Sequence, residues 1–446
     1  MNLPDTFSKA FRPMALIRFL FGIGVVEYPV GRPHHLISVA WSCFNCMIYV
    51  GFISLTNLMD FKDVDVEGSF LAAINSYIKL YGFTSLMLIS IFLSHRHKKA
   101  IDDNYRQLDY YNKKLGELGI PKDYELMFRT QRNILIIAFI VICILVGFNY
   151  VRSAGESSHV YNIYLIYTLT FNLIIDSVFV TTIRYVQNRF VRLNSVLIRS
   201  TDMKKRNISI SMVTDNPHSL FSHFTPLITN ISDNPPREIN NEVNKQWLLY
   251  IIGETRKIHR GLCQVSTKIN ELYSNQMVLL ITWTYGITAS TSYSLYLMIT
   301  SECPHESNCG IIDISYFIMW IWFHLGKLAL VFDACANTRF EAQRTGEVIH
   351  MLVETSFYDK DVRDQINLLS IQLIKNPLDF TVYGLFQIDS EGIARLALTI
   401  VTLLVIMIQL GDRNFVKDAD DPENGAFIPP ISSTFGINLT HSDFKL

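Results

Sequence analysis

The hydrophobic positions of this chain gather in seven long runs that are separated by polar segments. A helix that crosses the hydrocarbon layer takes about 20 predominantly apolar residues, and each run is close to that length with few charges. The runs cover residues 36–57, 70–94, 134–151, 160–183, 276–299, 311–334 and 393–410. This pattern predicts an all-α membrane protein with seven transmembrane helices. A shorter apolar stretch at 15–26 contains Arg18 and is expected to form an interfacial or packed helix.

Basic residues predict how the seven helices are oriented, because Lys and Arg near the ends of a span stay on the cytoplasmic side. The loop between the second and third runs carries nine Lys and Arg, and the loop between the fourth and fifth carries thirteen. The loops after the first, third and fifth runs carry one, one and none. The N-terminus is therefore expected inside and the C-terminus outside, the reverse of a G-protein-coupled receptor.

The polar segments divide the chain into units. Four spans are expected to continue into cytoplasmic helices, since apolar residues recur at helical spacing beyond the membrane. A segment rich in Pro, Asn and Ser predicts a mobile insert. The expected units are a cytoplasmic N-terminal segment (1–35), spans one to four (36–183), cytoplasmic helical extensions (184–275) with the mobile insert (201–244), spans five and six (276–335), a cytoplasmic helix and re-entry (336–392), the seventh span (393–410) and an extracellular tail (411–446).

Composition supports a membrane protein and offers little for catalysis. Apolar residues make up 49% of the chain and charged residues 18%, and the net charge of -1 gives no reason to expect a nucleic-acid partner. The motifs of metalloproteases, serine hydrolases and nucleotide-binding enzymes are lacking, so we expect neither an enzyme nor a cofactor, although a membrane enzyme with short motifs stays an alternative. Cys43 and Cys46 have the spacing of a metal pair, but without a second pair we interpret them as core residues.

The seventh apolar run carries a polar stripe. Its residues follow one another at intervals of 4, 4, 3, 4 and 3 and therefore share one narrow helix face: Glu391, Arg395, Thr399, Thr402, Ile406 and Gln409. Polar groups exposed to hydrocarbon each cost on the order of a few kcal/mol, so this face must contact protein or water. Polar helix packing explains a single such residue. A stripe along the whole helix favours a water-filled path, with Ile406 as an apolar constriction and Gln409 at the external mouth.

The same run resembles the last span of the insect gustatory receptors. That family ends in Thr-Tyr, five apolar residues and Gln-Phe, and this chain has Thr402-Leu403, five apolar residues and Gln409-Leu410. The preceding segment FTVYGLFQID, residues 380–389, is similar to the family's lead-in. Four residues resemble its pattern before the fifth span: His259, Leu262, Asn270 and Gln276.

The resemblance implies a homotetrameric ligand-gated cation channel in the plasma membrane, with assembly with other receptor subunits as the alternative. It further implies that the last helix lines the pore, that the cytoplasmic helices form the assembly interface, and that a small-molecule tastant binds in the outer half of each subunit. Two features depart from the family. Leu404 stands where the sugar-receptor branch has Glu, and the tail after Leu410 is longer than usual.

Polar and aromatic residues inside the other runs give the remaining candidates. At about 1.5 Å per residue, Asp176 and Lys327 lie at the same depth and could pair. A tentative ligand site consists of Lys79, Trp283, Tyr285, Tyr293, Tyr316, Trp320 and His324, and for the aromatic members an interface belt or core role is at least as plausible. In the predicted external segments, Cys303 and Cys309 could form a disulfide and Asn438 could carry a glycan.

The activating ligand stays open at this point. Planar or amine-bearing plant compounds, such as bitter tastants, would suit an aromatic pocket, and so would the face of a sugar such as fructose. A metabotropic seven-helix receptor is a further alternative. We expect cations, the tastant and membrane lipid as the partners of the channel.

Overall fold

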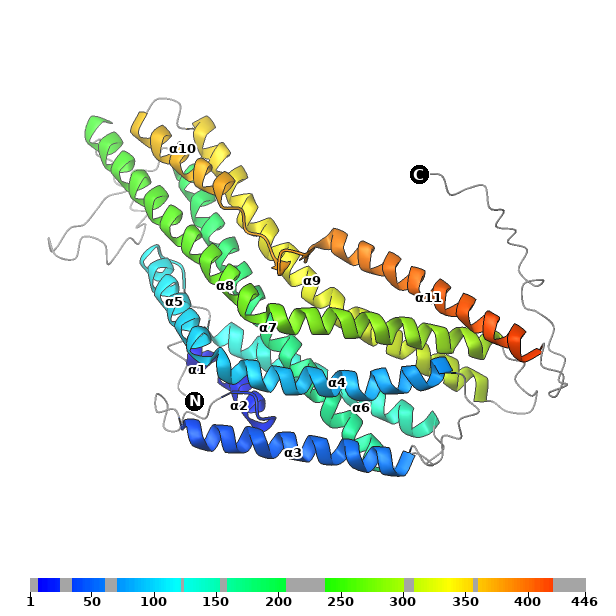
Figure 1. Ribbon diagram of the computed structural model, residues 1–446. Coiled ribbons are helices and arrows are strands. Elements are labelled where there is room, and N and C mark those ends of the chain that lie inside the picture. Colours follow the sequence, from blue (N-terminus) through cyan, green and yellow to red (C-terminus); the bar gives the residue numbers. More distant parts are fainter. Residues whose placement is uncertain are drawn as a thin grey trace, which may run out of the picture.

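The computed structural model describes residues 7–24, 34–60, 70–121, 124–152, 159–205, 237–300, 309–355 and 360–419 (Figure 1). Within these ranges the chain is almost entirely helical. Its elements are α1 (Phe7–Ala10), α2 (Arg12–Leu20), α3 (His35–Asp60), α4 (Phe70–Arg96), α5 (Lys98–Glu117), α6 (Tyr124–Arg152), α7 (His159–Lys205), α8 (Arg237–Thr300), α9 (Cys309–Thr355), α10 (Lys360–Lys375), β1 (Thr381–Val382), β2 (Phe386–Gln387) and α11 (Ser390–Ala419).

Each of the seven apolar runs lies inside one long helix: α3, α4, α6, α7, α8, α9 and α11. In the described part of the chain, five helices are long and apolar enough to cross a membrane by length and composition, namely α3, α6, α7, α9 and α11. A mostly helical protein with several apolar helices is therefore confirmed. Two points stay predictions: that α4 and α8 cross the membrane, and which loops lie on its cytoplasmic side and which on its external side.

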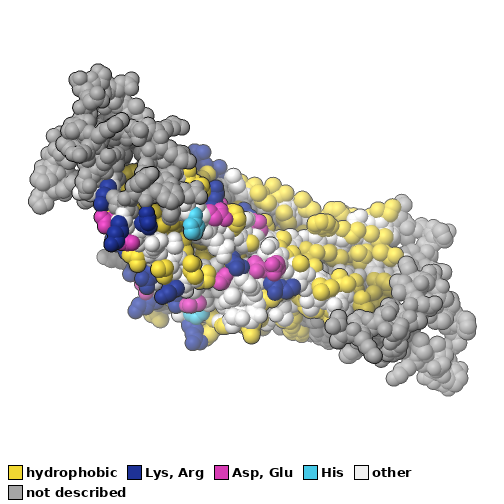
Figure 2. Space-filling view, turned by 90° about the horizontal axis from the view of Figure 1, so that it is seen from above, with side chains coloured by type: hydrophobic (Ala, Val, Ile, Leu, Met, Phe, Trp, Pro, Cys, Tyr) yellow, Lys and Arg dark blue, Asp and Glu magenta, His cyan; other side chains and the backbone are white. Residues whose placement is uncertain are grey.

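The molecule is elongated, with an apolar part and a charged part. The visible face is mostly hydrophobic toward one end, and Lys, Arg, Asp and Glu gather toward the other (Figure 2). Helices α7, α8 and α9 run from the first part into the second, where α5 and α10 lie beside them (Figure 1). Charged side chains are costly in hydrocarbon, so the charged part is the one expected outside the membrane. Its location on the cytoplasmic side stays a prediction.

The core is organised around α7. This helix packs against α3, α4, α6, α8 and α9, and its Phe171, Phe179 and Phe190 are fully buried. The N-terminal residues also enter the core, since Phe7 and Met14 are fully buried and the backbone N–H of Phe7 donates to Asp109 at 2.8 Å. The helix predicted at 15–26 corresponds to α2, which begins earlier, at Arg12, and ends at Leu20.

Several predicted boundaries differ from the structure. The ends of the predicted mobile insert are helical, because α7 continues to Lys205 and α8 begins at Arg237, while residues 206–236 lie outside the described ranges. The helix predicted before the last apolar run is divided into the end of α9 and a separate α10. Helix α11 extends to Ala419, into the predicted tail, and residues 420–446 are not described. Cys43 is exposed on α3, so its assignment to the core was wrong.

A small hairpin precedes α11 and was not expected in an all-α chain. Thr381 pairs with Gln387 and Val382 with Phe386, in antiparallel register. Tyr383 and Gly384 both have positive φ, 51° and 71°, so the turn needs a glycine at the second position, and the N–H of Leu385 closes it by donating to the carbonyl of Val382. The alternating apolar pattern around Tyr383-Gly384 was the available sequence signal.

Candidate functional site

Helix α11 lies on the outside of the described chain (Figure 1). Only 11% of its apolar window is buried, and its buried side chains face α8 and α9. All six residues of the polar stripe are exposed: Glu391, Arg395, Thr399, Thr402, Ile406 and Gln409. The side chain of Leu410 falls outside the described residues. The stripe is thus available for contact with water or with another molecule.

The stripe lies to one side of the face by which α11 packs on the chain. Leu396 and Ile400 are buried against the neighbouring helices, while the apolar Leu398 and Val401 are exposed on the opposite side. Thr399 and Thr402 each donate their hydroxyl hydrogen to the backbone carbonyl four residues earlier, at 2.8 and 2.9 Å. Their oxygen atoms keep lone pairs that can accept from water along this face.

The hairpin fixes where α11 begins, and residues that carried the family resemblance hold it. The side-chain amide of Asn270 on α8 donates to the carbonyl of Thr381 at 2.7 Å. Phe380 and Val382 are buried in the main core, and the N–H of Ile388 donates to the carbonyl of Phe380 at 2.9 Å. His259 precedes Asn270 on α8, and its Nε2–H donates to the carbonyl of Ala342 on α9 at 3.1 Å.

Asp176 and Lys327 meet in the middle of the helix bundle. Lys327 Nζ lies 2.8 Å from Asp176 Oδ2, and the two side chains are only 6% and 10% exposed. The equal depths estimated from the sequence are thus matched by an ion pair between α7 and α9. Breaking a buried pair leaves an uncompensated charge, which costs about 3–5 kcal/mol.

Three of the predicted ligand residues form one column on α9. Tyr316, Trp320 and His324 are buried, with ring centroids 6.1 Å apart for the first pair and 5.6 Å for the second. Tyr316 and Trp320 share a core cluster with apolar residues of α6, α7 and α8, and the α8 aromatics expected from the sequence are not part of that cluster. We call Tyr316, Trp320 and His324 the aromatic column.

The other predicted ligand residues lie elsewhere. Trp283 packs closely over Gly82 of α4, where an added Cβ would lie 2.5 Å from the indole. Tyr285 is next to α11, because its hydroxyl donates to the carbonyl of Thr399 at 3.0 Å. Tyr293 is buried with its ring stacked 6.4 Å from Tyr296. Lys79 lies on α4, and its side chain is outside the described residues.

Sequence reasoning missed a polar group beside the aromatic column. The Asn149 amide of α6 donates to Asn162 Oδ1 of α7 at 2.8 Å, and the Tyr316 hydroxyl donates to Asn149 Oδ1 at 3.4 Å. All three side chains are buried. Asn149 lies inside the third apolar run and Asn162 inside the fourth, and an amide within such a run was the signal that could have found them.

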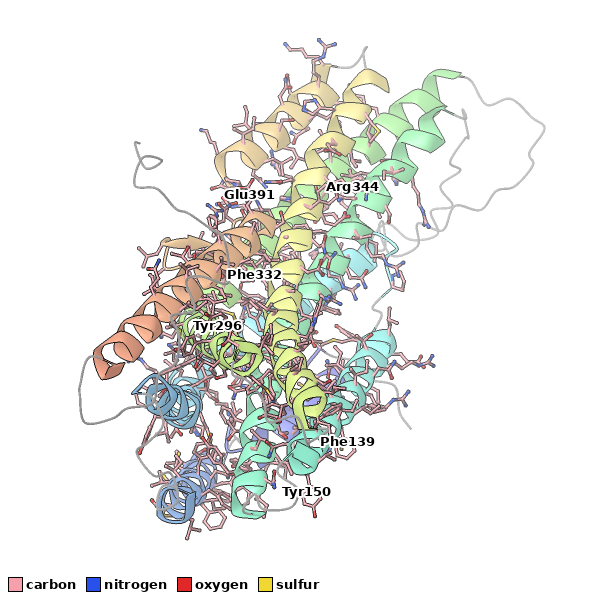
Figure 3. The ribbon with its side chains drawn as sticks, turned by 90° about the vertical axis from the view of Figure 1, so that its right-hand side faces the viewer. Phe139, Tyr150, Tyr296, Phe332, Arg344 and Glu391 are labelled. Atoms are coloured by element: carbon pink, nitrogen blue, oxygen red, sulfur yellow. The ribbon has the colours of Figure 1, made fainter. Side chains whose placement is uncertain are left out.

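A cavity of about 760 Å³ adjoins this polar group, between α6 and α7. Its lining includes Asn162 and Tyr150, with Ile142, Val146 and Leu173 separating it from the aromatic column. Tyr150 and Phe139, another lining residue, lie on α6 away from the start of α11 at Glu391 (Figure 3). The cavity is mostly apolar, which suits a small hydrophobic molecule.

The predicted disulfide and glycan fall on residues that the structure does not describe. Cys303 and Asn438 lie in undescribed segments, and Cys309 begins α9 without a described side chain. Among the described residues no group of three or more His, Cys, Asp or Glu could hold a metal ion.

Comparison with known sequences identifies the family. Residues 15–414 match the family model described as 7tm Chemosensory receptor. The chain is 20% identical to putative gustatory receptor 28a of Drosophila melanogaster over 95% of each protein. It is 25% identical to gustatory and pheromone receptor 32a of the same species, where the match covers 34% of this chain and 32% of that receptor.

Comparison with solved structures gives the same fold. The insect olfactory receptor OR5 from Machilis hrabei, in complex with eugenol, superposes with a TM-score of 0.56 at 12% identity. The match covers 90% of this chain and 98% of the olfactory receptor. Because the family model spans nearly the whole sequence, the chain belongs to the 7tm chemosensory receptor family.

Proposed function

We propose that this protein is a ligand-gated, non-selective cation channel that acts as a gustatory chemoreceptor in the plasma membrane. The observation that carries the proposal is the exposed stripe on α11, where Glu391, Arg395, Thr399, Thr402 and Gln409 lie on one face of an otherwise apolar helix. In an assembly of four copies around an axis, the four stripes would face one another and line a water-filled path. Lipid alone would leave these groups facing hydrocarbon.

The stripe offers what a cation path needs. Hydroxyl and amide oxygens of Thr399, Thr402 and Gln409 can replace part of the hydration shell of a passing cation. Ile406 lies between them and is 45% exposed in the single chain, so four such side chains would form an apolar ring in the assembly. A narrow apolar ring excludes water and holds the pore closed.

The ligand is proposed to bind in the outer half of the subunit, near the aromatic column. Among the described residues, the indole N–H of Trp320 is buried without a hydrogen-bond acceptor, so a ligand oxygen or nitrogen would satisfy it. The amides of Asn149 and Asn162 and the adjoining cavity add polar contacts and space. Tyr316 and Trp320 provide faces for a planar ring or a cation.

Bitter or other plant-derived small molecules are the ligand class that we favour. One relative, 22% identical over 34% of this chain, is named as the gustatory receptor for bitter taste 66a of Drosophila melanogaster. Leu404 disfavours the sugar branch, although a sugar such as fructose stays the alternative ligand. A metabotropic receptor with an external N-terminus is the alternative mechanism, and an N-terminal tag that antibody reaches on intact cells would favour it.

The experiment that tests the channel is Gln409→Ala, with Val401→Ala as the matched control. Both residues are exposed on α11, but Val401 lies on the exposed face away from the stripe. We expect Gln409→Ala to change single-channel conductance or the reversal potential in mixed-cation solutions at normal surface level, and Val401→Ala to leave both unchanged. Wild-type conductance and selectivity in Gln409→Ala would contradict a pore-lining role for this residue.

A further inference from the structure

One helix connects the aromatic column to the start of the pore helix. Helix α9 is continuous over 47 residues and carries the aromatic column, the ion-pair residue Lys327 and then Phe332 and Arg339. At about 1.5 Å per residue, the rise from Trp320 to Arg339 is roughly 28 Å. Because α9 is one continuous helix, a shift at the aromatic column would also move Arg339.

Arg339 holds the two carboxylates that flank the hairpin. Its Nε lies 3.1 Å from Asp379 Oδ1, before β1, and its Nη1 lies 3.5 Å from Asp389 Oδ2, after β2. The Asp389 side chain is only 14% exposed and the Arg339 side chain 30%. The ion pair between Arg339 and Asp389 is thus partly buried. Partly buried ion pairs are screened by salt less than pairs at the surface.

Asp389 is also the N-cap of α11. Its Oδ1 accepts a hydrogen bond from the backbone N–H of Gly392 at 2.8 Å, and Arg395 Nη2 of the same helix lies 3.6 Å from that oxygen. A carboxylate at this position satisfies an otherwise free N–H group and complements the positive end of the helix dipole. One carboxylate therefore contacts both α9 and the first turn of α11.

A second contact lies two turns away along α9. A Cβ added at Gly392 would come within 2.8 Å of the Phe332 ring and 2.7 Å of the carbonyl oxygen of Gln387. Phe332 is fully buried and its ring meets that of Phe386 edge to face, with centroids 5.9 Å apart. Figure 3 shows Phe332 on α9 beside the start of α11, where Glu391 is labelled. The first turn of α11 has little room to move independently of α9.

We infer that Arg339, Asp389 and Gly392 form a joint that positions the first turn of α11 and holds the ligand-free pore closed. The inference rests on the proposed channel function and names the residues that regulate it. In this joint Arg339 is a positioning residue that acts on the pore through Asp389. Movement of α9 at the aromatic column changes the joint, and α11 turns with it.

The test is the current without any ligand, measured per channel at the cell surface. Arg339→Gln and Asp389→Asn each remove one charge of the pair, and Asn still caps a helix, so the second variant keeps the cap. We expect either variant to raise the basal current at least fivefold with unchanged cation selectivity. The double variant should not exceed the larger single effect, because both remove the same interaction. Asp379→Asn, which removes the other partner of Arg339, is the control and should change the current less than twofold.

Three further variants show which part of the argument fails if the expected currents are absent. Ile406→Ser serves as the control for conduction: if it carries current while the pair variants stay silent at normal surface level, the joint is wrong and the channel stands. Silence of every variant, Ile406→Ser included, would contradict both the joint and the constriction at Ile406, while the channel itself is tested by the ligand-evoked current of Gln409→Ala. Should the charge variants fail to reach the surface, Gly392→Ala tests the steric half of the joint against Gly346→Ala, whose Cβ would meet only Leu373 at 3.7 Å. Wild-type basal current in Gly392→Ala would then contradict the joint.

Discussion

Helices α7 and α11 are both apolar and both long, yet they differ in what covers them. The candidate span of α7 is 67% buried within the chain, and that of α11 is 11% buried. The buried carboxylate of α7, Asp176, is paired inside the chain with Lys327. The polar groups of the α11 stripe point outward. A helix that keeps a polar face uncovered in one chain is built for contact with other copies or with water.

Because α7 is buried and the stripe of α11 is exposed, substitutions on the two helices should differ in whether they affect folding or current. Substitutions on α7 and its partners remove contacts that fold the single chain, so they should lower the amount of folded protein. Substitutions on the exposed stripe of α11 remove few contacts within the chain, and surface changes of this kind usually alter stability by less than about 0.5 kcal/mol. They should instead alter the current. The predictions below are ordered by their expected effect on the amount of folded protein.

The largest loss is expected from Lys327→Glu. This change places two carboxylates side by side where the structure has a buried pair, and removal of one partner alone costs about 3–5 kcal/mol. We expect surface protein, measured by labelling intact cells, to fall by more than tenfold. Asp176→Lys should do the same, and the combination of both reversals should restore part of the signal. A double variant no better than the worse single variant would show that the pair does not contribute in this way.

A smaller loss is expected on acidification, through His259. Burial lowers the pKa of His259 from its ordinary value near 6.5 to about 4. Between these values the unfolded chain binds a proton that the folded chain does not, so stability is lost as the pH falls below 6.5. The loss between pH 7 and pH 5 should be about 2 kcal/mol. Thermal unfolding of the detergent-solubilised protein at the two pH values measures it.

The control for this prediction is His350, which is exposed on α9. His259→Gln should flatten the dependence of the unfolding temperature on pH between 5 and 7, while His350→Gln should leave the slope as in wild type. Equal slopes in His259→Gln and wild type would mean that other groups cause the acid sensitivity.

The sequence revealed the elements whose signal is local. Runs of about 20 apolar residues located seven helices, and matched depths along their helices predicted the pairing of Asp176 with Lys327. The stripe was visible because helical spacing places its residues on one face. Each of these inferences needs only the geometry of a single helix.

What the sequence could not show depends on contacts between helices. Asn149 and Asn162 are 13 residues apart on successive helices, and only packing of α6 on α7 brings their amides together. Arg339 and Asp389 come from different helices, and the hairpin between Asp379 and Asp389 is stabilised by Asn270 on a third. The alternation of apolar residues around Tyr383-Gly384 is a hairpin signal, but strands of two residues make it too brief to stand out between the long helical runs.

The least effect on folding, and the clearest effect on function, is expected from Ile406→Ser. Ile406 is 45% exposed in the single chain and lies on the stripe between Thr402 and Gln409, so the change should leave surface protein near the wild-type level. If four such side chains close the pore by excluding water, a ring of hydroxyl groups would admit it. We therefore expect patch-clamp recordings to show current without ligand. Val401→Ser, on the exposed face away from the stripe, should give no such current. Normal surface protein with a silent Ile406→Ser channel would rule out the constriction, and lower surface protein without current would place Ile406 in a contact between helices.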